Sequence, residues 1–314
     1  MRKLIVIGLS LALAAFAAPA GADEAPLKVV ASFSILGDMV KNVAGARADV
    51  TVIVGPDSDA HSFEPGPGHA SALAEADLLV INGLGFEPWL VRLASAARSK
   101  ATYVVASYGV PARLRAEEAH AHAHKDDEAE DSQPASDGDF DPHAWQNLRN
   151  GIIYVRNIAE ALAKKDPVNA TLYEANAESY IAELSRLDEW VRAEIGRLPQ
   201  QKRKVITTHD AFGYFGAAYG VSFIAPVGLS NNAEPSAQAL AGLVDQIRSE
   251  KIRALFMENM TSPRMMEVIA RETGAEEGGT LYSDALSAPG GPAPTYTAMF
   301  RYNVPALITA MQKN

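Results

Sequence analysis

The seven histidines of this chain indicate metal binding, because imidazole nitrogen is a preferred zinc ligand. A closed zinc site takes four protein ligands, and the chain has no cysteine, so histidine and carboxylate must supply them all. The histidines fall into two groups, one within a polar acidic stretch and one spread along the chain: His120, His122 and His124, and then His61, His69, His143 and His209.

His61, His143 and His209 each come after an apolar segment that we interpret as a strand, and Asp284 directly follows the last such segment. Ligands of open α/β sheets bind outside the carboxyl ends of the strands, so we expect these four side chains at one level of the fold. Three imidazoles and one carboxylate match the four-coordinate preference of zinc. The pattern therefore predicts a zinc site, although any single histidine could instead be structural.

Several other polar residues lie close to these positions. His69 opens a predicted helix, and we expect a helix-start or surface role for it, since His61 already supplies that loop with a ligand. Glu64 and Asp210 lie at strand-to-helix turns, where a carboxylate either holds the outer nitrogen of a ligand histidine or caps a helix. Both interpretations stay open for these two residues. Glu258 also lies at a strand end, and we expect a structural role for it.

The elements that must position these residues alternate between apolar strands and amphipathic helices, in two successive runs. Continuous apolar strands are typical of parallel sheets that helices cover on both faces. We predict an α/β fold of two similar lobes, each a small parallel sheet flanked by helices. The first run has strands at 28–33, 50–54, 78–81 and 103–106 with helices at 36–44, 70–76 and 88–97; the second has strands at 205–207, 221–225, 254–257 and 280–283 with helices from 211, 236–250, 263–273 and 295–311.

Residues 167–198 predict one long helix that joins the two lobes. The segment is rich in alanine, glutamate, leucine and arginine, and it begins with a proline that favours a helix start. At about 1.5 Å per residue, such a helix can run the length of the molecule. The predicted organisation is an N-terminal lobe at 23–166, the linking helix at 167–198 and a C-terminal lobe at 199–314, with the metal in the cleft between the lobes.

Residues 117–139 are acidic and almost without large apolar side chains, so they cannot bury enough surface to order themselves. We predict a mobile loop at the mouth of the cleft. Its three histidines, His120, His122 and His124, form a weaker second metal site in one interpretation. A solvated acidic linker without a metal role is the alternative.

The first 22 residues have the anatomy of a secretory signal peptide. Arg2 and Lys3 precede a short apolar run, and small residues end the segment near Ala22. We expect export to the periplasm and a mature chain that begins near Asp23. Without a cysteine for lipid attachment, a free soluble protein is expected. The formal charge of −10 opposes binding to nucleic acid or anionic lipid.

Several motifs of the sequence resemble signature segments of a known family, the metal-specific solute-binding proteins of bacterial ABC importers (cluster A-I, ZnuA/TroA-like). The resemblance covers essentially the whole mature chain, and the combination of segments in this order is specific. The segments are Asp59-Ala60-His61-Ser62-Phe63-Glu64-Pro65, Asn82-Gly83-Leu84-Gly85-Phe86-Glu87, Asp141-Pro142-His143-Ala144-Trp145, Thr208-His209-Asp210-Ala211-Phe212-Gly213-Tyr214-Phe215, Glu234-Pro235-Ser236 and Arg301-Tyr302-Asn303.

This resemblance implies two lobes joined by a long rigid helix and a metal held by His61, His143, His209 and Asp284. Manganese-type members place a glutamate where His209 stands, so three nitrogens and one oxygen favour zinc. The sequence departs from the family at Ala285, where many relatives have proline, and at Gln146-Asn147, where an acidic residue is common.

The function implied is a periplasmic zinc receptor rather than an enzyme. It would work as a monomer, take up zinc, in one hypothesis from a donor protein, and deliver it to the inner-membrane permease of an ABC importer. Release is expected from local movement of the Asp284 loop and the acidic loop. A manganese receptor is the main alternative. A zinc hydrolase, with Glu64 or Asp210 as base, and a surface adhesin or storage protein are weaker ones.

Overall fold

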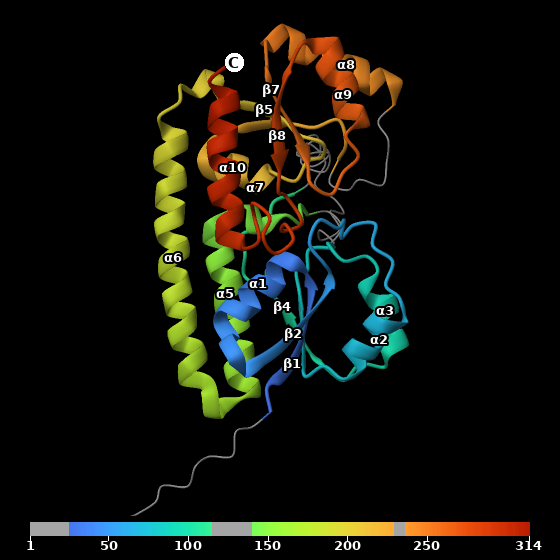
Figure 1. Ribbon diagram of the computed structural model, residues 1–314, viewed down its shortest axis with the longest axis vertical. Helices are drawn as coiled ribbons and strands as arrows, with labels where there is room; N and C mark the ends of the chain where they lie inside the picture. Colours follow the sequence, from blue (N-terminus) through green and yellow to red (C-terminus); the bar gives the residue numbers. More distant parts are fainter. Residues whose placement is uncertain (1–24, 115–139, 229–235) are drawn as a thin grey trace, which may run out of the picture.

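A computed structural model describes residues 25–114, 140–228 and 236–314 of the chain (Figure 1). The predicted signal peptide and the acidic stretch with His120, His122 and His124 lie outside the described residues. Two four-stranded parallel sheets form the centres of two lobes, which confirms the predicted fold class. Among the described helices, none is long and apolar enough to cross a membrane.

The N-terminal lobe is built on the sheet order β2-β1-β3-β4. Its helices lie on both faces, with α1 and α5 on one side and α2 and α3 on the other (Figure 1). Its elements are β1 Leu27–Phe33, α1 Ser34–Ala44, η1 Gly45–Arg47, β2 Ala48–Val54, α2 Pro67–Ala74, β3 Leu78–Ile81, α3 Leu90–Ala97, β4 Thr102–Val105, η3 Ala144–Gln146 and α5 Leu148–Lys165.

The C-terminal lobe repeats this plan with the order β6-β5-β7-β8. Helices α8 and α9 cover one face, and α7 and α10 lie on the side of the long helix (Figure 1). The elements are β5 Lys204–Ile206, α7 Gly213–Tyr219, β6 Ser222–Ile224, α8 Ala237–Glu250, β7 Ala254–Glu258, α9 Arg264–Thr273, β8 Glu276–Leu281 and α10 Tyr296–Met311.

The predicted long helix is present as α6, Ala170–Gly196, after the short turn η4, Pro167–Asn169; a second short turn, η5 (Gln200–Lys202), leads into β5. At 27 residues it is about 40 Å long, and it packs on α1 of the first lobe and on α7 and α10 of the second. Its buried residues recur every three or four positions, as expected of a helix with one apolar face.

The helix α5 was missed by the sequence analysis, although it packs along α6 and covers the first sheet. Its buried side chains follow a helical period, and Asn147 caps its start by accepting a hydrogen bond from the backbone N–H of Arg149 (3.0 Å). The sequence therefore contained both the helical period and the capping residue that predict α5. Asn147, which departs from the family pattern, is the residue that caps this helix.

The last helix, α10, ties the two lobes together. The backbone N–H of Tyr296 donates to Asp38 of α1 (2.9 Å), and its hydroxyl donates to the backbone oxygen of Trp145. Both Tyr296 and Trp145 are fully buried. The chain end is thus part of the first lobe's core as well as the second's.

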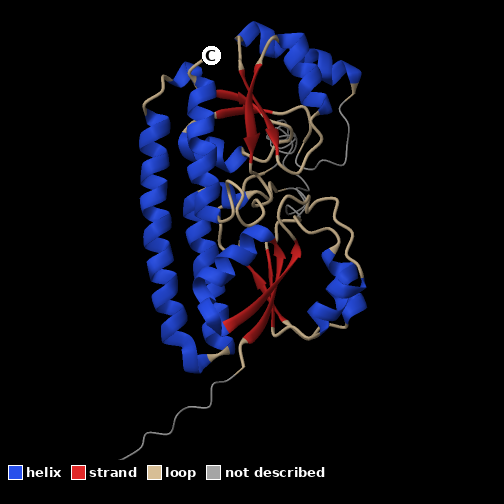
Figure 2. Ribbon diagram, viewed as in Figure 1, coloured by secondary structure: helices blue, strands red, loops and turns tan. Residues whose placement is uncertain are grey.

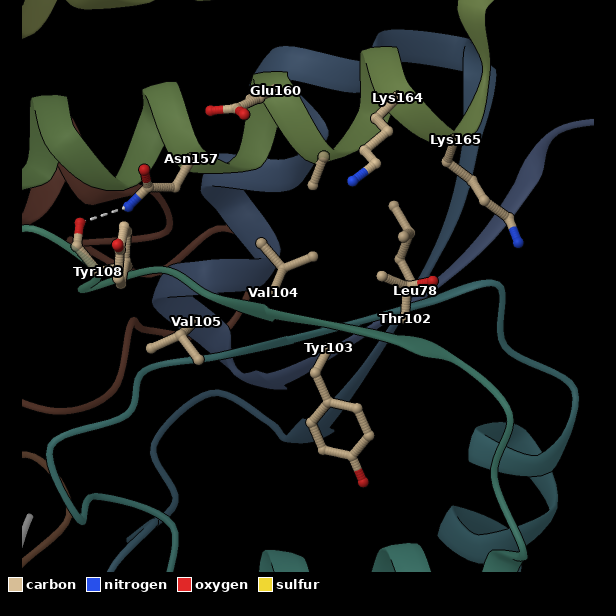
Figure 3. A pocket seen from close by; sticks show the side chains of 11 residues that line it. Leu78, Thr102, Tyr103, Val104, Val105, Tyr108, Asn157, Glu160, Lys164 and Lys165 are labelled. Carbon is tan, nitrogen blue, oxygen red and sulfur yellow. Dashed lines mark hydrogen bonds between the residues drawn. The ribbon is translucent and has the colours of Figure 1, made fainter.

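The carboxyl ends of the two sheets face each other across the middle of the molecule, where loops meet (Figure 2). This is the level at which the predicted ligands lie. Open grooves are found elsewhere, such as one of about 500 Å³ between β4 and α5, where Asn157 donates to the backbone oxygen of Tyr108 (Figure 3). That groove shares no residue with the predicted metal site.

Candidate metal centre

The four predicted ligands come together between the lobes, with one potential ligand atom from each within 4.8 Å of all the others. The Nε2 atom of His61 lies 3.2 Å from Nε2 of His143 and 3.3 Å from Oδ2 of Asp284. The same Asp284 oxygen is 3.1 Å from Nε2 of His209 and 3.7 Å from that of His143. His61 is 7% exposed and the other three are fully buried, so water is largely excluded from the centre.

His61 lies on the loop between β2 and α2, where Asp59 fixes its backbone. The Asp59 carboxylate accepts hydrogen bonds from the His61 N–H (2.8 Å) and the Ser62 hydroxyl (2.7 Å). The backbone oxygen of Ala60 accepts from the indole N–H of Trp89 (2.9 Å). These bonds turn the chain so that the imidazole points into the cleft.

His143 is held by a carboxylate two residues before it. Asp141 Oδ1 accepts from the His143 backbone N–H (2.9 Å) and lies 2.8 Å from ring atom Nδ1. This contact orients Nε2 towards the centre and makes the ring a stronger ligand. Asn82, at the end of β3, donates to the backbone oxygen of Pro142 (2.9 Å) and so anchors the loop.

His209 is held by Glu258 from the neighbouring strand β7. Glu258 Oε1 accepts from the backbone N–H groups of Thr208 and His209, both at 3.0 Å. Its other oxygen lies 2.8 Å from Nδ1 of His209 and accepts from the Ser283 hydroxyl. Glu258 is 2% exposed and connects His209 to the residue before Asp284.

The Asp284 loop is joined to the first lobe by two side chains that follow His143. The indole N–H of Trp145 (2.9 Å) and the amide of Gln146 (2.8 Å) both donate to the backbone oxygen of Ser283. An acidic residue at position 146 could not donate in this way. The glutamine that stands here in place of the common acidic residue therefore makes a hydrogen bond between the two lobes.

The buried charges of the site are strongly coupled. Burial disfavours the charged form of His143, but the negative charges of Asp284 and Asp141 have a larger effect and raise the pKa of His143 to about 9. Burial also disfavours the charged form of His209, but Glu258 and Asp284 have a larger effect and raise the pKa of His209 well above its usual value. Burial also opposes ionisation of Asp284, yet His143 and His209 hold its pKa well below the usual range. Burial lowers the pKa of His61.

Two buried polar atoms of the centre have no hydrogen-bond partner among the described residues, namely Nδ1 of His209, which has only its 2.8 Å ion-pair contact with Glu258, and Oδ1 of Asp284. A buried carboxylate oxygen without a donor is costly, and a cation is the partner that would compensate it. Four ligand atoms about 2.0–2.1 Å from a tetrahedral zinc ion lie about 3.3–3.4 Å from one another. Four of the six distances between the ligand atoms are 3.1–3.7 Å, close to that spacing, and all six are within 4.8 Å.

The carboxylates that support the histidines are not the two predicted ones. Glu64 is exposed, and Asp210 has no hydrogen bond from its side chain among the described residues. Asp141 and Glu258 take these positions instead, each 2.8 Å from Nδ1 of its histidine, so Glu258 is in contact with the site and not only with the surrounding fold. His69 is at a helix start, as expected, where its Nδ1 accepts from the backbone N–H of Gly66 (2.9 Å).

Comparison with known proteins identifies the family of this chain. Residues 29–310 match the protein family described as zinc-uptake complex component A, periplasmic. The manganese-binding lipoprotein MntA of Halalkalibacterium halodurans is 32% identical over 320 residues, which cover 100% of both chains. The iron-binding protein YfeA of Yersinia pestis is 32% identical over 88% of this chain and 84% of its own.

Solved structures show the same architecture. The periplasmic zinc-binding protein TroA of Treponema pallidum superimposes with a TM-score of 0.80 at 28% identity, covering 91% of this chain and 99% of that one. A manganese-bound mutant of the periplasmic metal-binding protein of Candidatus Liberibacter asiaticus gives 0.78 at 30% identity, covering 90% and 98%.

Members of this family are receptors of ABC importers and not enzymes, which excludes the hydrolase alternative. They work with the permease and ATPase components of the importer. The chain belongs to the ZnuA/TroA family and is a metal-binding, substrate-binding protein of an ABC importer.

Proposed function

We propose that this protein binds Zn²⁺ as its cargo through His61, His143, His209 and Asp284 and delivers it to its importer. The observation that supports this most is the cluster of three imidazole nitrogens and one carboxylate oxygen, all within 4.8 Å of one another, in a buried centre. Neutral nitrogen ligands suit zinc, whereas manganese prefers oxygen. A site with four protein ligands also fits tight capture of a cargo ion rather than catalysis, which needs an open position.

Manganese is the second candidate, and two specific observations favour it. Several relatives, MntA and PsaA proteins among them, are named as manganese-binding. The unpartnered Oδ1 of Asp284 would also allow the carboxylate to bind through both oxygens, which adds a harder ligand to the set.

The setting of this activity is proposed from the sequence. The mature chain begins near Asp23 after removal of residues 1–22, acts in the periplasm as a soluble monomer, and presents both lobes to the permease. The lobes are residues 23–166 and 199–314, and residues 167–198 link them. His120, His122 and His124 form a weaker second site that gathers zinc or accepts it from a donor protein.

Competition between the two ions tests the proposed cargo. The mature protein is titrated with zinc and with manganese against a chelator of known affinity, beside His209→Ala and Asp284→Ala. One zinc ion per chain, held more tightly than manganese and weakened in both variants, is the expected result. Tighter binding of manganese, or zinc binding that does not depend on His209, would overturn the proposal.

A further inference from the structure

Asp57 connects the loop that carries His61 to both ligand-bearing loops of the second lobe. It lies between the end of β2 and His61, and its carboxylate is exposed at the cleft. One oxygen accepts from the side-chain amide of Asn259 (2.8 Å), and the other accepts from the backbone N–H of Ala288 (3.2 Å). Its own backbone N–H donates to the oxygen of Leu286 (2.9 Å).

These partners are next to the residues that hold the metal. Asn259 directly follows Glu258, which supports His209, while Leu286 and Ala288 follow Asp284 within the same loop. Asp57 thus joins His61 to the elements of both second-lobe ligands. Apart from the contact of His61 itself with Asp284 (3.3 Å), no other residue of the His61 loop, within the described chain, hydrogen-bonds to the second lobe.

The loop that accepts and donates the Asp57 hydrogen bonds also has hydrogen bonds of its own. They restrict the loop near Ala288, a few residues after Asp284. The backbone N–H of Ser287 donates to the oxygen of Ala293 (2.9 Å), and the N–H of Ala293 donates back to the Ser287 hydroxyl (3.0 Å). Residues 287–293 are thus closed on themselves, directly after Leu286 and three residues beyond Asp284. Holding the loop at Leu286 and Ala288 therefore holds Asp284 as well.

The backbone of Asp57 has an unusual conformation that aims the carboxylate across the cleft. Its φ is 52°, in the left-handed region, which aspartate tolerates better than most residues. A glycine would adopt this backbone more easily but would have no carboxylate. The two properties can therefore be separated by substitution.

We infer that Asp57 is an interlobe latch that slows release of the bound ion. This rests on the proposed function, because the latch acts on the metal held by His61 and Asp284. With the metal in place, release requires the Asp284 loop to move away from the His61 loop, and the Asp57 hydrogen bonds oppose that movement. Since they lie at the exposed rim, they can be broken from outside without unfolding the buried centre.

The test measures how fast zinc leaves the protein when it is mixed with excess chelator in a stopped-flow instrument. Asp57→Gly keeps the backbone and removes the carboxylate, and loss of its charge-assisted hydrogen bonds is expected to speed release about tenfold. Asp57→Asn keeps one acceptor oxygen and should fall between Asp57→Gly and wild type. Glu64→Ala removes an exposed carboxylate from the same loop that makes no interlobe bond, and should release zinc like wild type.

The association rate and the stoichiometry separate a latch from a structural defect. Each variant should still bind one zinc ion, with an association rate within about threefold of wild type. Release from Asp57→Gly at the wild-type rate would overturn the latch while leaving the proposed function intact. Failure of the wild-type protein itself to bind zinc would instead overturn the proposed function.

Because the chain has no cysteine, the contact can also be locked covalently. In the double variant Asp57→Cys with Ala288→Cys, the oxidised form is expected to release zinc more slowly than the reduced form. Equal rates in both forms would contradict the latch. A pair that never oxidises would contradict it as well, since it would place the two loops apart in solution.

Discussion

Each lobe contributes two of the four proposed metal ligands, but the two lobes hold those side chains by different means. In the first lobe, Asp59 and Asp141 act within their own loops, two residues before His61 and His143. In the second lobe, Glu258 reaches across from another strand and connects His209 to Ser283, next to Asp284. The first half of the site is therefore set by local turns, whereas the second depends on the packing of several elements.

The hydrophobic cores of the two lobes also differ, in size and in how far they extend. One continuous core fills the first lobe, packs along α5 and α6 and continues to α7 and α10. A separate small core lies between α8, α9 and the outer face of the second sheet, and includes Leu243, Ile247 and Leu255. The outer side of the second lobe is thus less tied to the rest of the molecule than the first lobe is.

The largest expected effect is the loss of a ligand from either half. His143→Ala and His209→Ala should each weaken zinc binding more than about 100-fold. Loss of a residue that only supports a ligand weakens metal binding by at most about 100-fold, so loss of a ligand should exceed that value. Competitive titration against a chelator measures this. A histidine whose loss changed affinity less than tenfold would not be a ligand, and the site would belong mainly to the other lobe.

The supporting carboxylates test the difference between the halves directly. Asp141→Asn and Glu258→Gln should weaken binding by about 10- to 100-fold, with the larger loss at Glu258 because it also holds two backbone N–H groups and Ser283. The same titration applies, with Glu64→Gln as the exposed control. Equal losses at both positions would contradict the view that the second half depends more on distant packing.

The pH dependence of binding is expected to be smaller and to involve a histidine from each half of the site. The pKa of His143 is raised to about 9 and that of His209 is raised well above its usual value, so both rings carry a proton at neutral pH when no metal is bound. Metal needs the neutral rings and must displace these protons, so affinity rises with pH by about tenfold per unit for each proton, and the His143 contribution levels off above pH 9. Calorimetry in buffers of different ionisation enthalpy counts the protons released.

Asp141→Asn sharpens this test, because removing one cause of the raised pKa should lower the pH at which affinity levels off. An affinity that stays constant between pH 6.5 and 8.5 in the wild-type protein would mean that His143 is already neutral there.

The smallest effect on affinity is expected from the separate core. Ile247→Ala and Ile158→Ala each remove a buried isoleucine and should destabilise the protein by about 2–5 kcal/mol. Ile247→Ala should speed hydrogen exchange mainly in α8 and α9, whereas Ile158→Ala should do so throughout. Zinc affinity should change less than about threefold in both. Global loss of protection in Ile247→Ala would show that the two cores unfold as one.

The sequence predicted the four clustered residues because they follow strands, and parallel strands bring their carboxyl ends to one edge. It did not predict their supports correctly. Glu64 and Asp210 were chosen for being near a ligand in the chain, yet neighbours in a loop point in different directions. Glu258 reaches His209 only because β7 lies beside β5, a pairing that local pattern does not reveal. The helix α5 was overlooked beside the more conspicuous acidic stretch.

The position of α10 has a consequence for how the protein matures. Ribosomes and export channels deliver a chain from its N-terminus, so His61, His143 and His209 emerge well before Asp284 and the helix that follows it. The bonds of Tyr296 to Asp38 and Trp145 then add the last helix to the contacts that fix the second lobe against the first. The only anionic ligand and the helix that closes the molecule arrive together at the end. A half-made chain therefore lacks both the carboxylate of the clustered site and the helix that packs against the first lobe.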